Sequence, residues 1–469
     1  MGAAWAMLGV FFLGAGLLWG LGWHRGRAAC DQYDYHLRAI VKFAREMPRP
    51  DLHDYLSATT PGYHIVLAAV ARGVSEHPIF LQIVASGFTI ALLVVFGRAV
   101  GRAGARTGRS WLELVALALP FVASPYVFTS GVWLLPDNAG WLLALLLTLQ
   151  CLRGSMTVRR MVLCSAMLLA LVLVRQSHLW AAAPICAGAW LGRTPRSDES
   201  IAGSLTGRAR RVFPTLLAFI ACVPALATLA GFAWMWHGLT PPSFQKQHIV
   251  GAGGGINWAT VPFILSLVAV FSPFYLGWLW PGIVKLWRES RPAVVLIALG
   301  ALAWAIIPET TFLREPRSGG LWAVVGFLDR AGLTIAHHTS PLIVLLAPIG
   351  AVMLAAWLAM IDDKRRWIVG ATVAAFLAAQ SLNANCWQRY HEPFLLMLFA
   401  LISAAYGPGP EAAGTLRRPN ILTGLRIFGP MMLAALLGAI AVGGIIFGRD
   451  PLLPDPEQPS VSLPYDPAR

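Results

Sequence analysis

Carboxylate and imidazole side chains are concentrated in one short stretch, residues 29–68, where they could carry out proton transfer. Asp31, Asp34 and His36 lie together in its first part, in the segment "DQYDYH". A carboxylate or a neutral imidazole beside a hydroxyl group can accept its proton and turn the oxygen into a nucleophile. We therefore interpret these three residues as candidate catalytic groups. The pattern leaves open whether Asp31 or Asp34 is the base.

Basic side chains follow much later, in segments that are far apart in the sequence. They are Arg175 in "RQSH", Lys246 and His248 in "KQH", and Arg389 in "RYHEP". Guanidinium, ammonium and imidazolium groups bind phosphate and stabilise the charge that develops on it as it leaves. We take these four residues as candidate ligands of a donor phosphate. A basic residue at the end of an apolar segment can also serve only to reach the membrane surface, so this second interpretation of Arg175 stays open.

Further polar and aromatic residues adjoin both groups, and we interpret them as candidate substrate-binding residues. Pro61 and Gly62 are typical of a tight turn in "TTPGYH", which would leave the next two side chains near the membrane surface. The full candidate set is Tyr63, His64, Asp137, Gln176 and Tyr390.

The sequence shows no ligand pattern typical of a metal site. The six cysteines include no CxxC pair, and no HExxH segment occurs. His337 and His338 are adjacent, so on a helix their side chains would point about 100° apart, which is unfavourable for a shared metal. We therefore predict no metal site among the candidate residues and assign no cofactor. The sequence leaves a divalent metal open.

The elements that must position these residues are apolar helices. The chain has 469 residues, of which 57% are hydrophobic and 12% are charged, whereas soluble domains have about 25% charged residues. Apolar runs of roughly 18 residues or more recur along the chain. This pattern predicts an all-α, polytopic membrane protein and excludes a large soluble domain.

About thirteen segments are long and apolar enough to be read as membrane crossings. We expect them near residues 3–22, 79–97, 111–129, 135–152, 161–175, 178–192, 213–236, 259–284, 292–308, 341–361, 367–382, 391–406 and 427–447. The apolar stretch 61–73 is too short to cross, so we expect interfacial helices within a first outer loop, 23–78. Residues 1–447 then form a single transmembrane domain, and 448–469 form an outer, disordered tail.

The net charge of +14 is distributed as expected for orientation in a membrane. Arginine and lysine cluster in every second loop, at 98–109, 153–160, 193–211, 285–291, 364–366 and 417–426. The positive-inside rule places these loops and the N-terminus in the cytoplasm, although Arg25 and Arg27 alone would favour the opposite orientation. Because the basic residues lie in short loops between apolar segments, the charge does not indicate a nucleic-acid partner.

The order of the motifs resembles that of the GT-C superfamily of membrane glycosyltransferases. The resemblance is nearest to the α-1,2-glucosyltransferases that add the terminal glucose to the dolichol-linked oligosaccharide. It rests on "DQYDYH" at 31–36, "TTPGYH" at 59–64, "RQSH" at 175–178, "KQH" at 246–248 and "RYHEP" at 389–393. The chain departs from that family in three places. The family has an adjacent acidic pair, whereas Asp31 and Asp34 are not adjacent. "KQH" is one residue shorter than the family's basic-x-x-His loop, and Pro393 comes earlier than the proline of its "RYxxLP" segment. These departures put the acceptor and the glucose specificity in doubt.

This resemblance implies an inverting transfer of a hexose from a polyprenyl-phosphate sugar, with an Asp base in the first outer loop. The partners would be the lipid-linked donor, a glycan or lipid-linked glycan acceptor, and membrane lipids. Short arginine-rich loops and Ala/Gly-rich segments favour a bacterial inner-membrane protein whose site faces the periplasm. A lipid-linked saccharide ligase and a flippase or transporter remain alternatives. A ligase would favour a basic late outer loop such as 309–340, and a transporter would favour mid-span charges.

Overall fold

The computed structural model describes residues 2–154, 156–191, 204–248, 256–310, 319–383, 385–407 and 421–448. Within these ranges the regular structure is helical, apart from one isolated β-bridge between Ile335 and Thr339. The prediction of an all-α protein is therefore confirmed. The outer tail, which was expected to be disordered, lies outside the described residues from 449 onward.

Each predicted apolar segment corresponds to a helix or to a broken run of helices. Six described helical segments are long and apolar enough to cross a membrane, or seven if the bent pair α5–α6 is one span. The chain is thus a multi-pass membrane protein. In order, the helices are α1 (Gly2–Gly20), α4 (Pro78–Arg106), α5 (Trp111–Ala123) with α6 (Pro125–Val132), α7 (Asp137–Cys151), α8 (Val158–Val174), α9 (Ala182–Leu191), α10 (Ser204–Trp236), α12 (Thr260–Phe271) with α13 (Leu276–Glu289), α14 (Arg291–Ile306), α16 (Pro341–Ala359), α17 (Asp363–Ser381), α18 (Glu392–Tyr406) and α19 (Ile421–Phe447).

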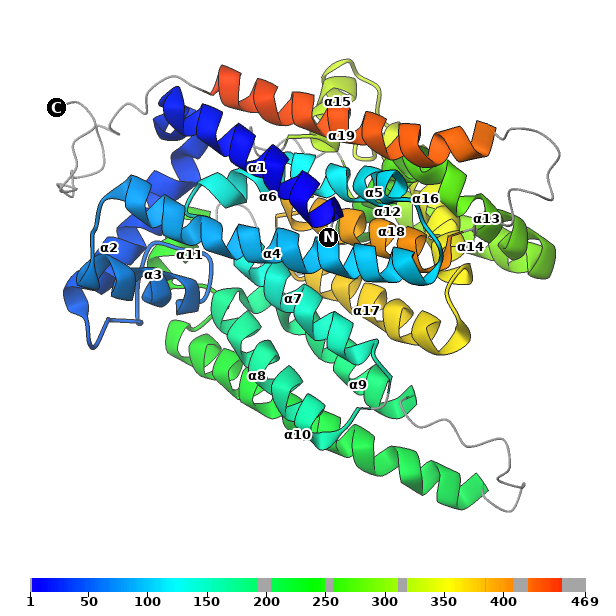
Figure 1. Ribbon diagram of the computed structural model, residues 1–469, viewed down its shortest axis with the longest axis horizontal. Helices are drawn as coiled ribbons and strands as arrows, with labels where there is room; N and C mark the ends of the chain where they lie inside the picture. The colour runs from blue at the N-terminus through cyan, green and yellow to red at the C-terminus, as the bar shows by residue number, and fades with distance from the viewer. Residues whose placement is uncertain are drawn as a thin grey trace.

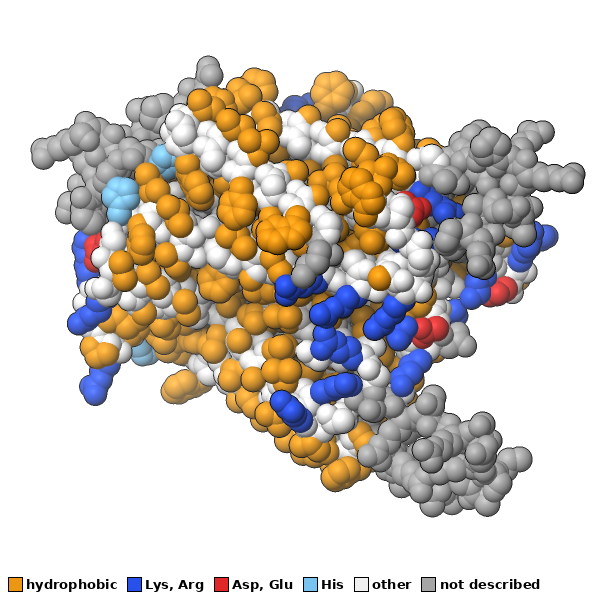
Figure 2. Space-filling model, viewed as in Figure 1, with side chains coloured by type: hydrophobic (Ala, Val, Ile, Leu, Met, Phe, Trp, Pro, Cys, Tyr) orange, Lys and Arg blue, Asp and Glu red, His pale blue; other side chains and the backbone are white. Residues whose placement is uncertain are grey.

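The surface of α10 shows how such a helix meets lipid. Only 17% of its apolar window is buried, and Leu216, Phe219 and Val223 are among its exposed side chains. Apolar side chains on the outside of a helix bundle are favourable in a bilayer, because they contact lipid hydrocarbon instead of water. Figure 2 shows hydrophobic side chains over most of one face, with many Lys and Arg side chains towards its right half.

The loops separate into two ends of the helix bundle, as the charge alternation predicts. At one end Ala28 N–H donates to the Gly448 carbonyl over 2.9 Å. At the other end the Thr107 hydroxyl donates to the Ala404 carbonyl over 2.9 Å, and Arg109 lies 5.0 Å from the Trp278 ring centroid. Residues that were assigned to the same side of the membrane therefore contact each other at the same end.

The first loop folds as short helices that cap the first of these ends. A π-helical turn (Gln32–His36) continues into α2 (Leu37–Glu46), and α3 (Gly62–Gly73) packs on α2. Together with α11 (Pro242–His248), these helices lie at the left of the bundle in Figure 1. At 12 residues, α3 is too short to cross a membrane, so the expectation that 61–73 does not span holds.

This cap has its own hydrophobic core. Ile40 and Phe43 of α2 and Leu67 of α3 belong to this core. Leu81 of α4 and Trp236 at the end of α10 complete it. The Trp236 indole N–H also donates to the Leu52 carbonyl over 2.8 Å. The cap is therefore fixed to the membrane helices by apolar packing, and it holds the acidic segment 31–36 in a defined place.

A sharp bend between α5 and α6 shapes the same end of the bundle. The two helices meet at 65°, because Pro125 begins α6 and the Ser124 hydroxyl accepts hydrogen bonds from Tyr126 N–H and Val127 N–H. Proline at the first helical position and serine at the N-cap both favour a new helix start. The bend directs the following segment, 130–136, towards the first loop.

Candidate active site

Asp31 and Arg389 form an ion pair across the end of the bundle that carries the cap. An Asp31 carboxylate oxygen, Oδ2, accepts from Arg389 Nη1 over 2.5 Å, and the two side chains are 23% and 25% exposed. The neighbouring Gln32 is fully buried. Its Oε1 accepts from Gln82 Nε2 over 2.8 Å and from Leu134 N–H over 2.9 Å. Gln32 therefore anchors the acidic segment to α4, and Asp31 is directed at the arginine.

A second ion pair, between Asp137 and Arg175, lies beside the first and is more deeply buried. Asp137 begins α7, where a carboxylate is stabilised by the helix N-terminus. The next residue, Asn138, donates through Nδ2 to Thr89 Oγ1 and to the Val127 carbonyl, each over 2.8 Å. Asn138 thereby fixes the start of α7 against α4 and α6.

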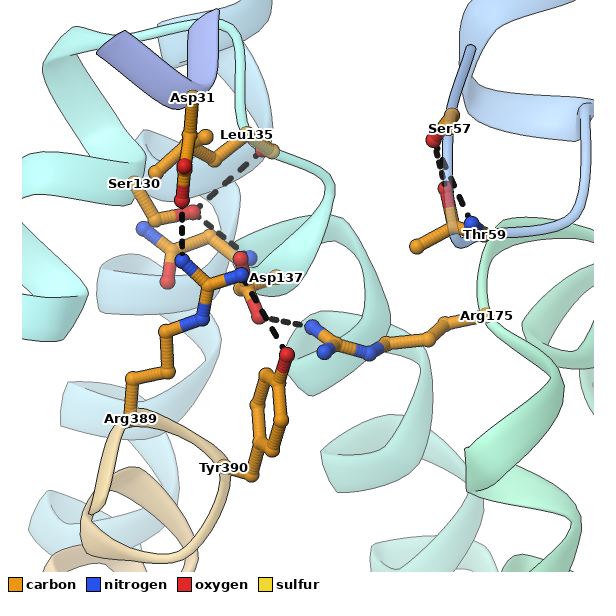
Figure 3. A network of polar contacts seen from close by, with 10 residues as sticks. Asp31, Ser57, Thr59, Ser130, Leu135, Asp137, Arg175, Arg389 and Tyr390 are labelled. Atoms are coloured by element: carbon orange, nitrogen blue, oxygen red, sulfur yellow. Dashed lines mark hydrogen bonds and ion pairs between the residues drawn. The ribbon is translucent and has the colours of Figure 1, made fainter. Parts of the chain in front are cut away.

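Tyr390 lies between the two guanidinium groups. Arg175 Cζ is 4.3 Å and Arg389 Cζ is 5.1 Å from its ring centroid. Arg389 Nη2 also donates to the Tyr390 hydroxyl over 3.4 Å. Figure 3 shows the two aspartates and the two arginines converging around this ring from separate parts of the fold. Five predicted site residues, with three different predicted roles, thus form one cluster.

The cluster has a specific electrostatic character. It contains two carboxylates and two guanidinium groups, so its formal charge is balanced. Arginine forks bind two oxygens of a carboxylate or of a phosphate in the same way. The arrangement can therefore bind an anion, provided that the anion replaces one or both carboxylates.

The segment that carries Arg389 is held by a buried polar network that the sequence analysis did not identify. The Ser124 hydroxyl donates to Glu392 Oε1 over 2.6 Å, and Gln388 Nε2 donates to Glu392 Oε2 over 2.6 Å. Gln388 Oε1 in turn accepts from Leu321 N–H over 2.8 Å. A signal was present in the sequence, since a glutamate at the start of an apolar segment needs partners when it is buried.

His36 and His64 lie next to this cluster and contact each other. Nδ1 of His36 and Nε2 of His64 are 2.9 Å apart, and the two ring planes are 18° apart with their centroids separated by 5.2 Å. Burial lowers the pKa of His36 to about 4, although the Asp31 and Asp137 carboxylates oppose this shift. Burial also lowers the pKa of His64 well below its usual value. Both imidazoles are therefore neutral near pH 7.

Two further substrate-binding candidates, Gln176 and Tyr63, help to fix the "TTPGYH" segment in place. Gln176 Oε1 accepts from Thr60 N–H over 3.1 Å, and its Nε2 donates to the Ala58 carbonyl over 2.6 Å. The Tyr63 side chain is buried, with its ring centroid 5.9 Å from that of Phe88. Burial is the main cause that raises the Tyr63 pKa, and the Asp137 charge adds to it. This segment is therefore fastened to the end of α8.

Three other candidates have a less defined geometry. Asp34 is half-buried in the π-helical turn. Lys246 and His248 belong to α11, but their side chains lie outside the described residues. The helix itself is docked on the first loop, because Ser243 N–H donates to Asp54 Oδ1 over 2.7 Å. The backbone of the "KQH" segment is thus next to the cap.

In the described residues, no group of three or more His, Cys, Asp or Glu side chains could hold a metal ion. Phosphate binding by the arginines would need no metal, since guanidinium groups neutralise an anion directly.

Comparisons with known proteins give little direct guidance. No protein-family model matches the sequence, and no curated protein matches it. Among solved structures, the chain is similar to ArnT from Cupriavidus metallidurans, a structure described as bound to undecaprenyl phosphate. The two share 16% sequence identity at a TM-score of 0.37, over 94% of this chain and 78% of that chain.

Proposed function

We propose that this protein is a membrane glycosyltransferase of the GT-C type. It transfers a hexose from a polyprenyl-phosphate sugar to a glycan or lipid-linked glycan acceptor. In this proposal it is a bacterial inner-membrane protein with a cytoplasmic N-terminus, and its site faces the periplasm. The observation that carries the proposal is the cluster in which Asp31 from the first loop pairs with Arg389, and Arg389 and Arg175 both contact the Tyr390 ring.

The position of the cluster supports a lipid-linked donor. Arg175 directly follows α8, and Arg389 lies in the short turn Gln388–Tyr390 just before α18, so both are near the ends of apolar helices. A phosphate whose polyprenyl chain is in the hydrocarbon would have its charge at this level. Each guanidinium group is already paired with a carboxylate. A donor phosphate would therefore take the place of a carboxylate at one or both arginine forks.

The transfer would be a single displacement. A first-loop carboxylate, Asp31 or Asp34, accepts the proton of the acceptor hydroxyl. The oxygen then forms a bond to the anomeric carbon, and the bond from that carbon to the phosphate oxygen breaks. The electron pair leaves with the phosphate, whose added negative charge is stabilised by Arg175 and Arg389. One displacement inverts the configuration of the anomeric carbon.

Donor binding and release of the base are coupled in this scheme. Asp31 is paired with Arg389 over 2.5 Å, and a carboxylate bonded to a guanidinium is a weaker base than a free one. A phosphate that takes the Arg389 fork sets Asp31 free. The base would then become available only when the donor is present, which limits wasteful activation of water.

The alternatives receive less support from the described residues. A transporter would favour charged groups in the middle of its spans, whereas this cluster lies at helix ends. A ligase was expected to use basic residues of loop 309–340. Of these, Arg330 is exposed at the end of α15 (Leu321–Arg330), and Arg314 and Arg317 lie outside the described residues.

The experiment that tests the proposal uses purified protein in lipid nanodiscs. It is incubated with a panel of radiolabelled polyprenyl-phosphate hexoses and with extracted lipid-linked glycans as acceptors. We expect one hexose to move from the donor lipid to an acceptor, and we expect Asp31→Asn to abolish this movement. If the label stays on every donor under all conditions, the proposal is wrong.

A further inference from the structure

A hollow on the surface of α4 lies at the opposite end of the bundle from the ion-pair cluster. Its volume is about 410 Å³, and it is lined by Arg98, Gly101, Arg102 and Ala105. The last three residues follow the first by three, four and seven positions, so all four share one face of the helix. Glycine and alanine leave space beside the two long arginine side chains.

The hollow lies at the depth of the lipid headgroups. Helix α4 has 29 residues, whereas about 20 helical residues cross the hydrocarbon of a bilayer. The segment 78–97, counted from the end that carries the cap, is of this length and contains no charged residue. Arg98 is the first charged residue after it, so its guanidinium group can reach the phosphates of the surrounding lipids.

The arginines of this part of α4 have no carboxylate partner among the described residues. Arg98, Arg102 and Arg106 are exposed, and the ion pairs between described side chains include none of them. Figure 2 shows Lys and Arg side chains gathered over the region where Figure 1 places the end of α4. Because like charges four positions apart on a helix repel each other, an anion between Arg98 and Arg102 would stabilise this arrangement.

We propose that this hollow is a binding site for an anionic phospholipid, whose phosphate accepts hydrogen bonds from Arg98 and Arg102. The acyl chains extend from there along the same face of α4, where Ala91, Val94 and Val95 are half-buried. Positive charge at the membrane surface attracts anionic headgroups, and the hollow provides space for one of them. The inference does not depend on the transfer reaction.

Orientation of the chain in the membrane does not account for this arrangement. The positive-inside rule depends on how many Arg and Lys residues lie near the end of a span, and not on the face of the helix that carries them. Arg106 contributes to that number as much as Arg98 and Arg102 do, but it does not line the hollow. It therefore provides a matched control on the same helix.

The test measures lipid binding to the purified protein in a mild detergent. Phosphatidylglycerol or zwitterionic phosphatidylcholine is added, and bound lipids are counted by native mass spectrometry. We expect wild-type protein to bind phosphatidylglycerol more tightly. We expect Arg98→Gln and Arg102→Gln each to weaken this binding roughly five-fold, and Arg106→Gln to change it less than about two-fold. Ala105→Trp keeps every charge but fills the hollow, so we expect weaker binding there as well.

Three results would overturn the proposal. An equal loss in all three arginine variants would mean that the lipid responds to charge in general. Unchanged binding by Ala105→Trp would place the lipid elsewhere. A dimer that binds no phosphatidylglycerol and that Ala105→Trp separates into monomers would make the hollow an interface between two copies.

Thermal unfolding gives a second measurement and shows whether each variant retains the fold. A ligand that binds the folded state raises the melting temperature, so we expect phosphatidylglycerol to stabilise the wild type and Arg106→Gln more than Arg98→Gln or Arg102→Gln. Equal stabilisation of all four proteins would contradict the proposal. If Ala105→Trp does not fold, the comparison of the arginine variants decides.

Discussion

At the scale of single residues, the site is defined by charged side chains that form ion pairs with each other. Asp31 pairs with Arg389 and Asp137 pairs with Arg175, and both pairs were assembled from candidates chosen for their chemistry. What the sequence could not show is that the carboxylates and the arginines neutralise each other. The paired residues are 358 and 38 positions apart in the sequence. A local sequence pattern does not show that such distant residues are in contact.

The first residue-scale prediction concerns the base. Asp31→Asn keeps the size of the side chain and its bond to Arg389 through the amide oxygen, but it cannot accept a proton. Loss of a general base lowers turnover by roughly 10²–10⁴-fold. We expect Asp31→Asn to show this loss in the nanodisc transfer assay, with Asp34→Asn as the matched comparison. The reverse result, with Asp34→Asn inactive and Asp31→Asn active, would assign the base to Asp34.

The second residue-scale prediction concerns acid stability. The pKa of His36 is lowered to about 4, so between pH 6.5 and pH 4 the unfolded chain binds more protons than the folded chain. Stability therefore falls as the pH drops through this window, by about 2 kcal/mol at pH 5 for this one group. Thermal unfolding from pH 7.5 to 5 measures the loss.

The control for this effect is a double variant, His36→Leu with His64→Phe. It removes both buried imidazoles, so we expect its melting temperature to depend less on pH than that of the wild type. An equal pH dependence in both proteins would mean that other groups cause the acid loss.

At the scale of elements, apolar length and loop charge were sufficient to place the helices, since each predicted span corresponds to a helix or a broken run. The details that position the site were not predictable in the same way. The 65° bend between α5 and α6 and the Ser124–Glu392–Gln388 network depend on contacts between distant segments. A polar residue in an apolar segment indicates that its side chain forms hydrogen bonds, but the sequence does not identify the residues to which it bonds.

Gly62 provides the element-scale prediction. A Cβ at this position would lie 2.7 Å from the Leu173 carbonyl oxygen, whereas a Cβ on Gly73 at the other end of α3 meets nothing within 4 Å. Gly62→Ala must push α3 away from α8, at a cost of about 1–3 kcal/mol. We expect a lower melting temperature and lower transfer activity for Gly62→Ala, and near-wild-type values for Gly73→Ala. Similar values for both variants would show that the close approach is unimportant.

At the scale of the whole molecule, the two ends of the bundle are chemically different. One end carries the cap and the ion-pair cluster, and the other carries arginine-rich loops such as 98–109. The alternation of charge predicted which loops share an end, and contacts such as Thr107 with Ala404 agree with it. Which end faces the cytoplasm is a proposal, because a helix bundle alone has no orientation.

Cysteine labelling in intact cells tests that orientation. Arg106 at the end of α4 and His53 in the cap are both exposed, and each is replaced by Cys. We expect a membrane-impermeant maleimide to label His53→Cys above the wild-type background, and to label Arg106→Cys only after the cells are opened. Labelling of Arg106→Cys in intact cells would reverse the orientation, and the donor would then have to be on the cytoplasmic side.

The proposed mechanism requires that the two arginines hold a donor phosphate in place of the carboxylates. Binding of a polyprenyl phosphate to wild-type protein, Arg389→Lys and Asp31→Asn in nanodiscs tests this claim most directly. A lysine keeps the charge but cannot bind two phosphate oxygens as a fork, and the neutral amide of Asp31→Asn no longer competes as an anion for Arg389. We predict at least about tenfold weaker binding for Arg389→Lys, which corresponds to about 1.4 kcal/mol, and equal or tighter binding for Asp31→Asn. Equal affinity of Arg389→Lys and wild type, or weaker binding by Asp31→Asn, would contradict the account.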